Sequence, residues 1–427
     1  MNEPAIAVAV MLPDGSQRFI ERGQAVFEHG IPANDSTVFN VGSVAKQFTA
    51  YLVLLAARRG ALDLEEKAEH YLPRLAVPGI TIAQLLTHTS GLRDAEAMLS
   101  LCGYRELDHY TGDDLLNLAY RQRERAVRPE TFLYSNTNYQ VLAKILETVH
   151  GDGFTRLAQK EIFAPLGMSA TSFRDDTRTV VPNAAASYEH DHGHVIHAGR
   201  PVALAGPGSL WTNPRDLLIW LAELHATWTC EERTFPFEPS CPHAPCDNAG
   251  HLYGPGLFAR TNGSPAVFHN GHEHGFSAST YVGRDGLAVA CAANAAWVQA
   301  DRVATAIVSC PEGDLDAVIT KISAGAAHPT VGNHERGLGS RSVEVLGAYT
   351  APELPGIIRI GRVDGTLVVL RRGTVDSLAA IGPSGLAFQG AGLVVTFPTP
   401  PTKRAPSSFV LDLDRAPAIT YWLTEHP

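Results

Sequence analysis

Ser43 and Lys46 are the first residues of the chain whose types and spacing suggest chemistry. They lie three positions apart in the stretch VGSVAKQFTAYLVLL, directly before an apolar run. On a helix, side chains at positions i and i+3 lie on the same face and meet. A hydroxyl at the first turn can attack a carbonyl, the backbone N–H groups there can bind the oxyanion, and a desolvated lysine can take the proton. We interpret Ser43 as a candidate nucleophile and Lys46 as its base.

A tyrosine and an asparagine stand before the next long apolar pattern. In LYSNTNYQVL, Tyr134, Ser135 and Asn136 open a helix that the pattern predicts over 136–150, with Ser135 or Asn136 as its cap. Beside a lysine, the phenol of Tyr134 could be held as a phenolate and act as a general base. The amide of Asn136 could donate to a substrate carbonyl.

A third segment, VFHNGHEHGF, combines a histidine with a glycine on a predicted strand. Gly271, two residues after His269, would let a substrate backbone approach closely because it has no side chain. The backbone amide of His272 would then be available as a second oxyanion donor.

These three segments carry a family resemblance. In chain order, the motifs are Ser43-x-x-Lys46, Tyr134-x-Asn136 and His269-x-Gly271. Together they resemble the serine β-lactamase-like and penicillin-binding-protein-like family. The resemblance is closest to the class C β-lactamase and D-aminopeptidase branch, in which histidine replaces the lysine of the third motif. Further stretches, among them TIAQLLTHTSGL and AGPGSLWTNPRDLLIWLAEL, extend it over roughly 5–310. Residues 345–427 more loosely resemble a lipocalin-like β-domain.

The resemblance implies a role for each motif residue. Ser43 would form an acyl-enzyme, while Lys46 and Tyr134 would activate it and carry protons to the leaving group. Asn136 would orient the acyl amide of the substrate.

The third motif has implied roles too, and it departs from the family pattern. His269 would support Tyr134 or a substrate carboxylate, and the amides of Ser43 and His272 would form the oxyanion hole. The family usually has small residues where this chain has His272, Glu273 and His274, so the width and charge of its pocket should differ.

The predicted fold is α+β. Strands near the N-terminus and strands after residue 250 flank a helical middle, and we expect them to share one antiparallel sheet flanked by helices, with a helical lobe beside it. We predict a β-lactamase/transpeptidase-like catalytic domain over 1–310 and a Gly-, His- and polar-rich linker over 311–342. Short strands separated by Gly turns predict a small lipocalin-like β-barrel over 343–427.

Composition restricts the partners and the compartment. The 427 residues carry a formal net charge of −10, so no basic surface for nucleic acid is indicated. No run of eighteen apolar residues suggests a membrane span, and the N-terminal stretch lacks the pattern of an export signal. Six scattered cysteines do not suggest a disulfide framework. We therefore expect a cytoplasmic protein with no membrane or nucleic-acid partner; its oligomeric state stays open.

Two segments rich in metal-ligand residue types compete with this interpretation. The loop 230–251 contains Cys230, Cys241, His243, Cys246 and His251, but their spacing matches no usual structural zinc site. The tract YEHDHGHVIH places four histidines beside the expected cleft, where they would shape substrate entry or be solvated. We predict no metal and no cofactor.

The function expected from these observations is hydrolysis of a small ester or amide through an acyl-serine, as in an esterase, amidase or D-stereospecific peptidase. The first alternative is a cytoplasmic acyltransferase of secondary metabolism, in which an amine replaces water, as in peptide cyclases and in antibiotic assembly. Which occurs depends on whether the site excludes water and positions the amine. An inactive scaffold that only binds is the remaining alternative.

Overall fold

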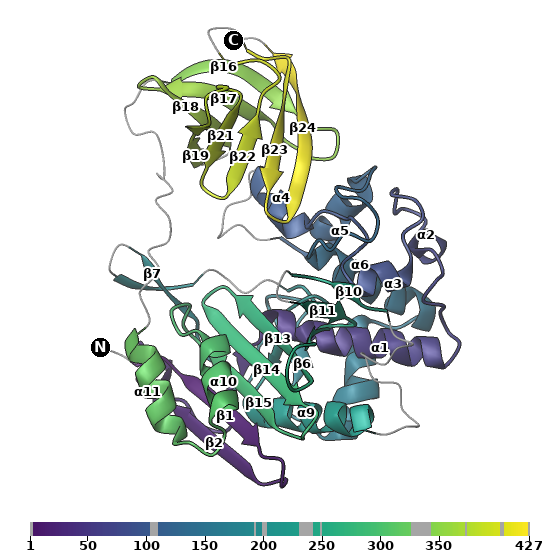
Figure 1. Cartoon of the computed structure of the whole chain (residues 1–427), viewed down its shortest axis with the longest axis vertical. Helices are drawn as coiled ribbons and strands as arrows, with labels where there is room; N and C mark the ends of the chain where they lie inside the picture. Colours follow the sequence, from purple (N-terminus) through teal and green to yellow (C-terminus); the bar gives the residue numbers. More distant parts are fainter. Residues whose placement is uncertain are drawn as a thin grey trace.

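The computed structural model describes residues 3–102, 110–191, 194–198, 203–229, 242–247, 250–325, 343–371, 374–401 and 405–425. Figure 1 shows an antiparallel sheet with helices on its faces, a group of helices beside it, and a barrel-like sheet near the C-terminus. The predicted α+β class with a C-terminal barrel is confirmed. None of the described helices is both long and apolar enough to cross a membrane.

The large sheet has the strand order β10-β11-β12-β13-β14-β15-β1-β2. As expected from the sequence, the N-terminal strand β1 pairs with β15, and Ile6 lies opposite Ala293. Alternate residues of β1 belong to two different cores, alanines to one and Ile6, Val8 and Val10 to the other, so both faces of the strand are buried. The strands are β1 (Ile6–Met11), β2 (Gln17–Arg22), β10 (Ala244–Pro245), β11 (His251–Gly254), β12 (Leu257–Arg260), β13 (Ala266–Glu273), β14 (Phe276–Gly283) and β15 (Ala288–Ala293).

Helices cover both faces of this sheet. The alanine face of β1 shares its core with α1 (Lys46–Arg58) and α9 (Pro214–Thr229), and the other face packs under α10 (Ala300–Ser309) and α11 (Leu315–Gly325).

Helix α11 occupies residues that the sequence predicted as part of a linker. Leu315, Val318, Ile319 and Ile322 recur at helical spacing and pack in the same core as α10, which explains why this segment folds onto the sheet. Residues 326–342, the rest of the predicted linker, lie outside the described residues.

The remaining helices include those beside the sheet. Helix α6 coincides with the predicted range 136–150 and ends at Gly151, which takes the left-handed conformation. The helices are α2 (Ala68–Tyr71), α3 (Ile82–Leu86), α4 (Ala95–Leu101), α5 (Gly112–Arg121), α6 (Asn136–His150), α7 (Phe154–Ala158) and α8 (Ala164–Leu166), with short turns η1 (Gly42–Ala45) and η2 (Gln159–Phe163). Small sheets join β3 (Gln24–Val26) to β4 (Ile31–Pro32), β9 (Leu210–Thr212) to β5 (Phe39–Asn40) and β6 (Ser172–Phe173), and β7 (Tyr188–Asp191) to β8 (His194–His197).

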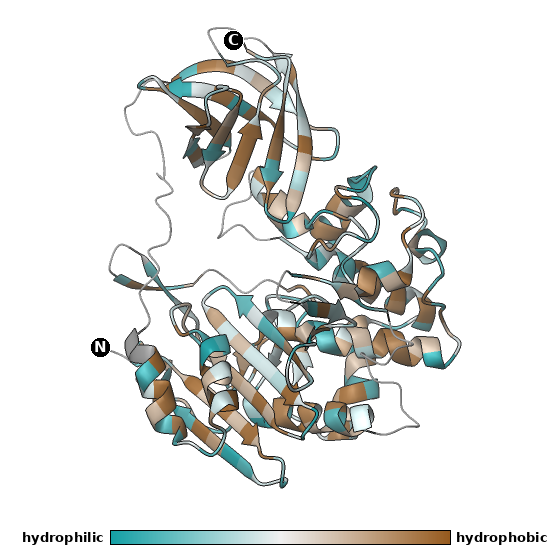
Figure 2. Ribbon diagram, in the orientation of Figure 1, coloured by the Kyte–Doolittle hydropathy of each residue, from teal (hydrophilic) through white to brown (hydrophobic). Residues whose placement is uncertain are grey.

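The C-terminal sheet has nine strands in the order β19-β18-β17-β16-β24-β23-β22-β21-β20. Its interior is filled by side chains, including the aromatic rings of Tyr349, Phe397, Phe409 and Tyr421; Figure 2 shows brown, apolar positions on these strands. The strands are β16 (Val343–Thr350), β17 (Ile358–Val363), β18 (Thr366–Arg371), β19 (Thr374–Ser377), β20 (Ala379–Ile381), β21 (Ala387–Gly390), β22 (Leu393–Thr396), β23 (Ser408–Leu413) and β24 (Ala416–Glu425).

The barrel is docked on α4. Ala95, Met98 and Leu99 of this helix belong to the same apolar cluster as the barrel interior. Beside them, the buried side chain of Arg93 pairs with Glu353 at 3.0 Å and donates to the carbonyl of Pro417 at 2.8 Å. Helix α4 therefore links the barrel to the catalytic part of the chain.

Candidate active site

Ser43 lies in the turn η1, where strand β5 passes into helix α1. The turn needs a glycine at position 42, which has a φ of 49° and lies against the backbone of His272 on β13. The side chain of Asn40 holds the turn by accepting the N–H of Gly42 at 2.9 Å. The hydroxyl of Ser43 is thereby placed at the first turn before α1, as the sequence predicted.

Lys46 is fully buried and makes three short contacts through Nζ. Its partners are Ser43 Oγ at 2.9 Å, Asn136 Oδ1 at 2.8 Å and the carbonyl of Pro207 at 2.9 Å. Burial lowers the pKa of Lys46 to about 7, although the Asp94 carboxylate acts in the opposite direction. In the neutral amine, the two N–H bonds can go to the amide and carbonyl oxygens, so the lone pair points to Ser43.

Tyr134 stands directly before α6 and hydrogen-bonds Ser43. Burial raises its pKa above the ordinary value of a phenol, with the bond to Ser43 acting against this rise. Lys46 Nζ lies 5.0 Å from the centre of the Tyr134 ring, and its hydrogen bonds go to Ser43, Asn136 and the carbonyl of Pro207. Burial therefore favours the protonated phenol in the free protein, and a phenolate at Tyr134 stays a prediction.

Asn136 is fixed on all sides. Its Oδ1 accepts from Lys46, its Nδ2 donates to Glu96 Oε2 at 2.5 Å, and its backbone N–H donates to Asp94 Oδ2 at 2.9 Å. Asp94 is also the N-cap of α4, where it accepts the N–H of Ala97 at 3.0 Å. The sequence analysis missed Asp94 and Glu96; the cap-like pattern RDAEAM would have located the helix start but not its contact with Asn136.

His269 lies beside Tyr134, as expected, and its Nε2 makes a polar contact with Tyr253. It is 1% exposed, and its Nε2 lies 3.3 Å from the hydroxyl of Tyr253, whereas its ring centre is 6.4 Å from that of Tyr134. Burial lowers the pKa of His269 to about 3, so the ring is neutral. The neutral, buried ring packs against the rings of Tyr134, Tyr253 and Phe258, and it offers no charge to a substrate carboxylate.

Gly271 lies against the turn that carries Ser43. A Cβ atom at this position would collide with the carbonyl oxygen of Val41 and would lie 3.1 Å from the backbone N of Ser43. The missing side chain thus permits a close approach of the chain's own turn, while the approach of a substrate backbone stays a prediction. The contact brings β13 against η1, so the backbone segments carrying the amides of Ser43 and His272 lie next to each other.

A pair of carboxylates, Glu96 and Glu273, adds charge to the site. Glu273 follows the third motif, and its pKa is raised well above the ordinary value by burial and by the nearby Glu96. Glu96 accepts the hydroxyl of Tyr110 at 3.0 Å as well as the amide of Asn136. Glu273, which stands where the family usually has a small residue, thus shares the site with Glu96, and the pair favours one negative charge over two.

The histidine tract forms the hairpin β7–β8. His197 pairs with Glu28, which also accepts the hydroxyl of Tyr188 at 2.5 Å, and the ring of His190 lies 4.1 Å from that of Trp297. His192 lies outside the described residues.

The cysteine loop is described only in part, because Cys230 and Cys241 lie outside the described residues. Within it, His251 Nδ1 lies 2.6 Å from Asp247 Oδ2, and the Cys246 thiol contacts the carbonyl of His251. Over the part of the chain that the structure describes, no group of three or more His, Cys, Asp or Glu side chains is arranged to hold a metal.

Comparison with known proteins agrees with this geometry. Residues 2–308 match the protein family described as Beta-lactamase. A D-aminopeptidase of Cereibacter sphaeroides is 25% identical over 364 residues, which is 85% of this chain and 66% of the relative. The chain thus spans 66% of the length of that D-aminopeptidase.

Two solved structures share the fold. The octameric penicillin-binding protein homologue of Pyrococcus abyssi superimposes with a TM-score of 0.62 at 20% identity and covers 99% of this chain and 96% of its own. The D-amino acid amidase of Ochrobactrum anthropi SV3 does so with a TM-score of 0.59 at 22% identity, over 68% of this chain and 86% of its own. The first of these likenesses includes the barrel.

Proposed function

Because the chain belongs to the beta-lactamase family, we propose that it is a serine hydrolase that cleaves a small amide or peptide through an acyl group on Ser43. The observation that carries this proposal is the contact of 2.9 Å between Lys46 Nζ and Ser43 Oγ, made by a lysine whose pKa is lowered to about 7 by burial. A base near neutral pH within hydrogen-bond distance of a hydroxyl is what nucleophilic catalysis requires.

Acylation follows from this arrangement. Ser43 Oγ attacks the amide carbonyl and its proton passes to Lys46, while the amides of Ser43 and His272 bind the oxyanion. The carbon–nitrogen bond then breaks, and the leaving amine takes a proton. Tyr134 can deliver that proton, because its phenol is protonated and hydrogen-bonded to Ser43. The phenol then recovers a proton from Lys46.

Deacylation uses the same groups in reverse. Lys46, again neutral, takes a proton from water directly or through Tyr134. The water oxygen forms a bond to the acyl carbon, and the ester bond to Ser43 breaks with return of a proton to its oxygen. His269 only supports this network, since it is buried and neutral.

The substrate class is proposed from the acidic pocket. Glu96 and Glu273 lie near Lys46. Because burial and the neighbouring Glu96 raise the pKa of Glu273, the two carboxyl groups together favour a single negative charge beside the nucleophile. Such a pocket suits a substrate whose acyl part carries a free ammonium group. Similarity to a D-aminopeptidase and a D-amino acid amidase supports the same class and suggests D-amino acid amides.

Transfer of the acyl group to an amine would use the same acyl-Ser43. Two of the three similar proteins named above are a D-aminopeptidase and a D-amino acid amidase, which supports water as the acceptor.

Mass spectrometry of the intact protein tests the proposal. D-alanine amide and L-alanine amide are incubated with the protein and with the Ser43→Ala variant, and product and covalent adduct are measured. We expect release of D-alanine and an adduct of one acyl group that is lost in the variant. An added amine that gave an amide product faster than hydrolysis would favour the acyltransferase. Turnover by Ser43→Ala equal to the unmodified protein would refute the nucleophile.

A further inference from the structure

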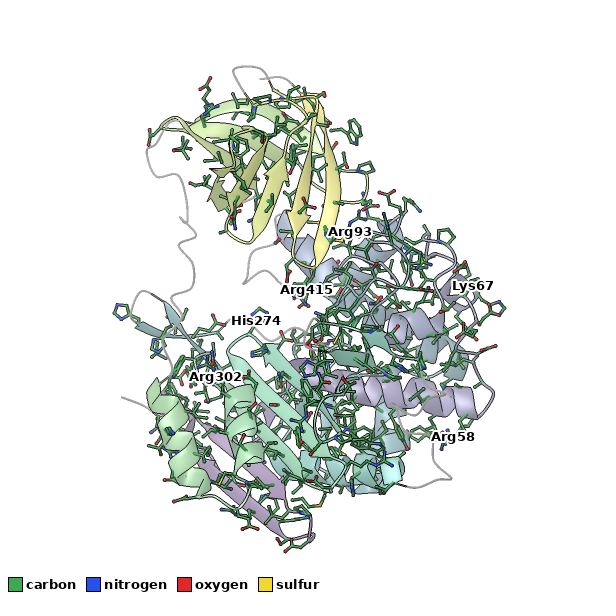
Figure 3. All side chains as sticks on the ribbon, viewed as in Figure 1. Arg58, Lys67, Arg93, His274, Arg302 and Arg415 are labelled. Carbon is green, nitrogen blue, oxygen red and sulfur yellow. The ribbon has the colours of Figure 1, made fainter. Side chains whose placement is uncertain are left out.

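His88 lies two residues after the end of α3, in the stretch LLTHTSGL. Its backbone has a φ of 57°, the left-handed conformation that glycine or asparagine usually takes after a helix, so ending the helix does not by itself explain a histidine here. Figure 3, drawn in the view of Figure 1, shows side chains crowded where α3, α6 and β11 come together. His88 is fully buried among these elements, and its ring centre lies 5.2 Å from that of Tyr139 on α6 and 4.7 Å from that of Tyr253 on β11.

His88 binds the backbone on both sides of Tyr134. Its carbonyl oxygen accepts the N–H of Leu133 at 2.8 Å, and its Nδ1 accepts the N–H of Ser135 at 3.2 Å. The imidazole also packs on the phenol ring itself, with ring centres 4.3 Å apart. The residues before and after Tyr134 and its ring are therefore all held by this one residue.

The contacts of Nδ1 determine the tautomer of His88. Nδ1 accepts from Ser135 and lies 2.9 Å from Nδ2 of Asn138, whose Oδ1 accepts the hydroxyl of Ser90 at 2.6 Å. With two donors directed at Nδ1, the proton of the neutral ring is on Nε2. Burial and the nearby charge of Lys46 lower the pKa of His88 well below its ordinary value, so the ring stays neutral and Nδ1 stays an acceptor.

The other ring nitrogen shows that packing does not explain the histidine. Among the described residues, Nε2 of His88 is buried without a hydrogen-bond partner. The imidazole has aromatic neighbours, with ring centres at 6.0 Å or less, in Phe132, Tyr134, Tyr139 and Tyr253. Since an unpaired buried N–H lowers the stability of a fold, packing alone would favour an apolar side chain here. The acceptor at Nδ1 is what an apolar side chain could not supply.

We propose that His88 is a positioning residue that keeps Tyr134 within hydrogen-bond distance of Ser43 by fixing the backbone of 133–135. This rests on the proposed function, in which Tyr134 delivers a proton to the leaving amine. The phenol must meet Ser43 before attack and the leaving nitrogen afterwards, and a misplacement of about 1 Å can lower a rate by about 100-fold. The contacts of His88 are with this segment and the rings around it, so it acts through Tyr134 and not on the substrate.

Two amide substitutions test which ring nitrogen matters. Asparagine places its amide at the distance of Nδ1 and tolerates the left-handed backbone, whereas glutamine places its amide at the distance of Nε2. For hydrolysis of D-alanine amide, we expect His88→Gln to lower kcat by about 10- to 100-fold and to change KM by less than about threefold. His88→Asn should keep kcat within about fivefold of the unmodified protein. Tyr349→Phe, which removes a buried hydrogen bond to the carbonyl of Pro406, is the control for a bond lost away from the site.

The Tyr134→Phe background tests whether His88 acts through the phenol. Without the phenol, His88→Gln should lower kcat by less than about a further threefold, because the group that it positions is gone. An equal loss in both backgrounds would overturn the proposal, as would a His88→Asn variant as slow as His88→Gln. If His88→Gln did not fold, folded His88→Asn decides, since a loss of kcat greater than about tenfold would overturn the proposal.

A signal that needs no substrate separates this inference from the proposed function. In protein labelled with ¹³C at Cζ of tyrosine, the nuclear magnetic resonance signal that is lost in Tyr134→Phe identifies Tyr134. We expect this signal to broaden or split in His88→Gln, as for a ring with more than one position, and to stay single and sharp in His88→Asn. Equally sharp single signals in both variants would overturn the positioning by His88. Failure of the unmodified protein to hydrolyse D-alanine amide would refute the proposed function, and the Tyr134 signal would then decide on the positioning.

Discussion

The catalytic part and the barrel are both built on antiparallel sheets, yet they bury different chemistry. Beneath Ser43 the chain buries an amine and an imidazole, Lys46 and His269, each at most 1% exposed. Inside the barrel, Phe409 stacks on Tyr421 with ring centres 5.0 Å apart, and further apolar side chains surround them. The first region uses burial to shift pKa values, whereas the second uses it to fill a core.

This difference indicates how the barrel contributes to function. A filled barrel has aromatic side chains where a ligand would lie, so its effect on the site must come from its outer surface. That surface meets the site at α4, where Arg93 and Arg415 contact the barrel and Asp94 respectively. Single substitutions can therefore distinguish three contributions: catalysis at Ser43, the contact between the barrel and α4, and the packing of the barrel interior.

The largest expected effect is that of Ser43→Ala. If the buried polar region is the catalytic one, removal of the nucleophile should lower kcat by about 1,000-fold or more, because no acyl group can form. The measurement is hydrolysis of D-alanine amide together with the intact mass of the protein. Ser309→Ala, which removes an exposed hydroxyl at the end of α10, is the matched control. Equal activity of Ser43→Ala and Ser309→Ala would contradict the assignment of catalysis to the region around Ser43.

The pH dependence of the reaction tests the shifted lysine. Because neutral Lys46 is the base and its pKa lies at about 7, kcat/KM should rise with pH below about pH 7 and level off above it. Lys46→Met should lower the rate by about 100-fold or more at every pH. Its free energy of unfolding should fall by about 1–3 kcal/mol, because Asn136 Oδ1 and the carbonyl of Pro207 lose the donor that Lys46 supplies. A kcat/KM that kept rising up to about pH 10, near the ordinary pKa of a phenol, would instead indicate that Tyr134 is the base.

The sequence predicted the local features of this site better than its contacts. Helix α6 and the positions of Ser43 and Lys46 followed from apolar periodicity and from i, i+3 spacing, which are local properties. The partners of Asn136, namely Asp94 and Glu96, lie about forty positions away and depend on how α4 packs on α6. The upward shift of the pKa of Tyr134 could not be predicted from the sequence for the same reason, because burial is a property of the folded chain.

The next largest effect is expected at the contact between α4 and the barrel, which Arg93 stabilises. Arg93→Ala leaves Glu353 without its cation and frees the carbonyls of Pro417 and Ala418, so we expect a loss of about 3–5 kcal/mol in the free energy of unfolding. Turnover should fall less than in Ser43→Ala, through displacement of the neighbouring Asp94. Denaturant unfolding and hydrolysis of D-alanine amide measure the two effects. Arg74→Ala, an arginine stacked on Tyr120 away from the barrel, is the control. Unchanged stability would show that the barrel is held by apolar contacts alone.

The smallest effect on turnover is expected inside the barrel. Phe409→Leu keeps most of the apolar volume but removes the ring contacts with Tyr349, Phe397 and Tyr421, at centre distances of 4.9, 5.7 and 5.0 Å. The free energy of unfolding should fall by about 1.5 kcal/mol. The value of kcat/KM should change by less than about twofold, because the described side chains of the barrel core make no contact with Ser43, Lys46 or Tyr134. Denaturant unfolding followed by far-UV circular dichroism measures the change in stability. Initial rates measured well below the unfolding transition give the change in kcat/KM. A loss of turnover as large as that of Arg93→Ala, in protein that is still folded, would mean that the core and the site are coupled through α4 rather than divided by it.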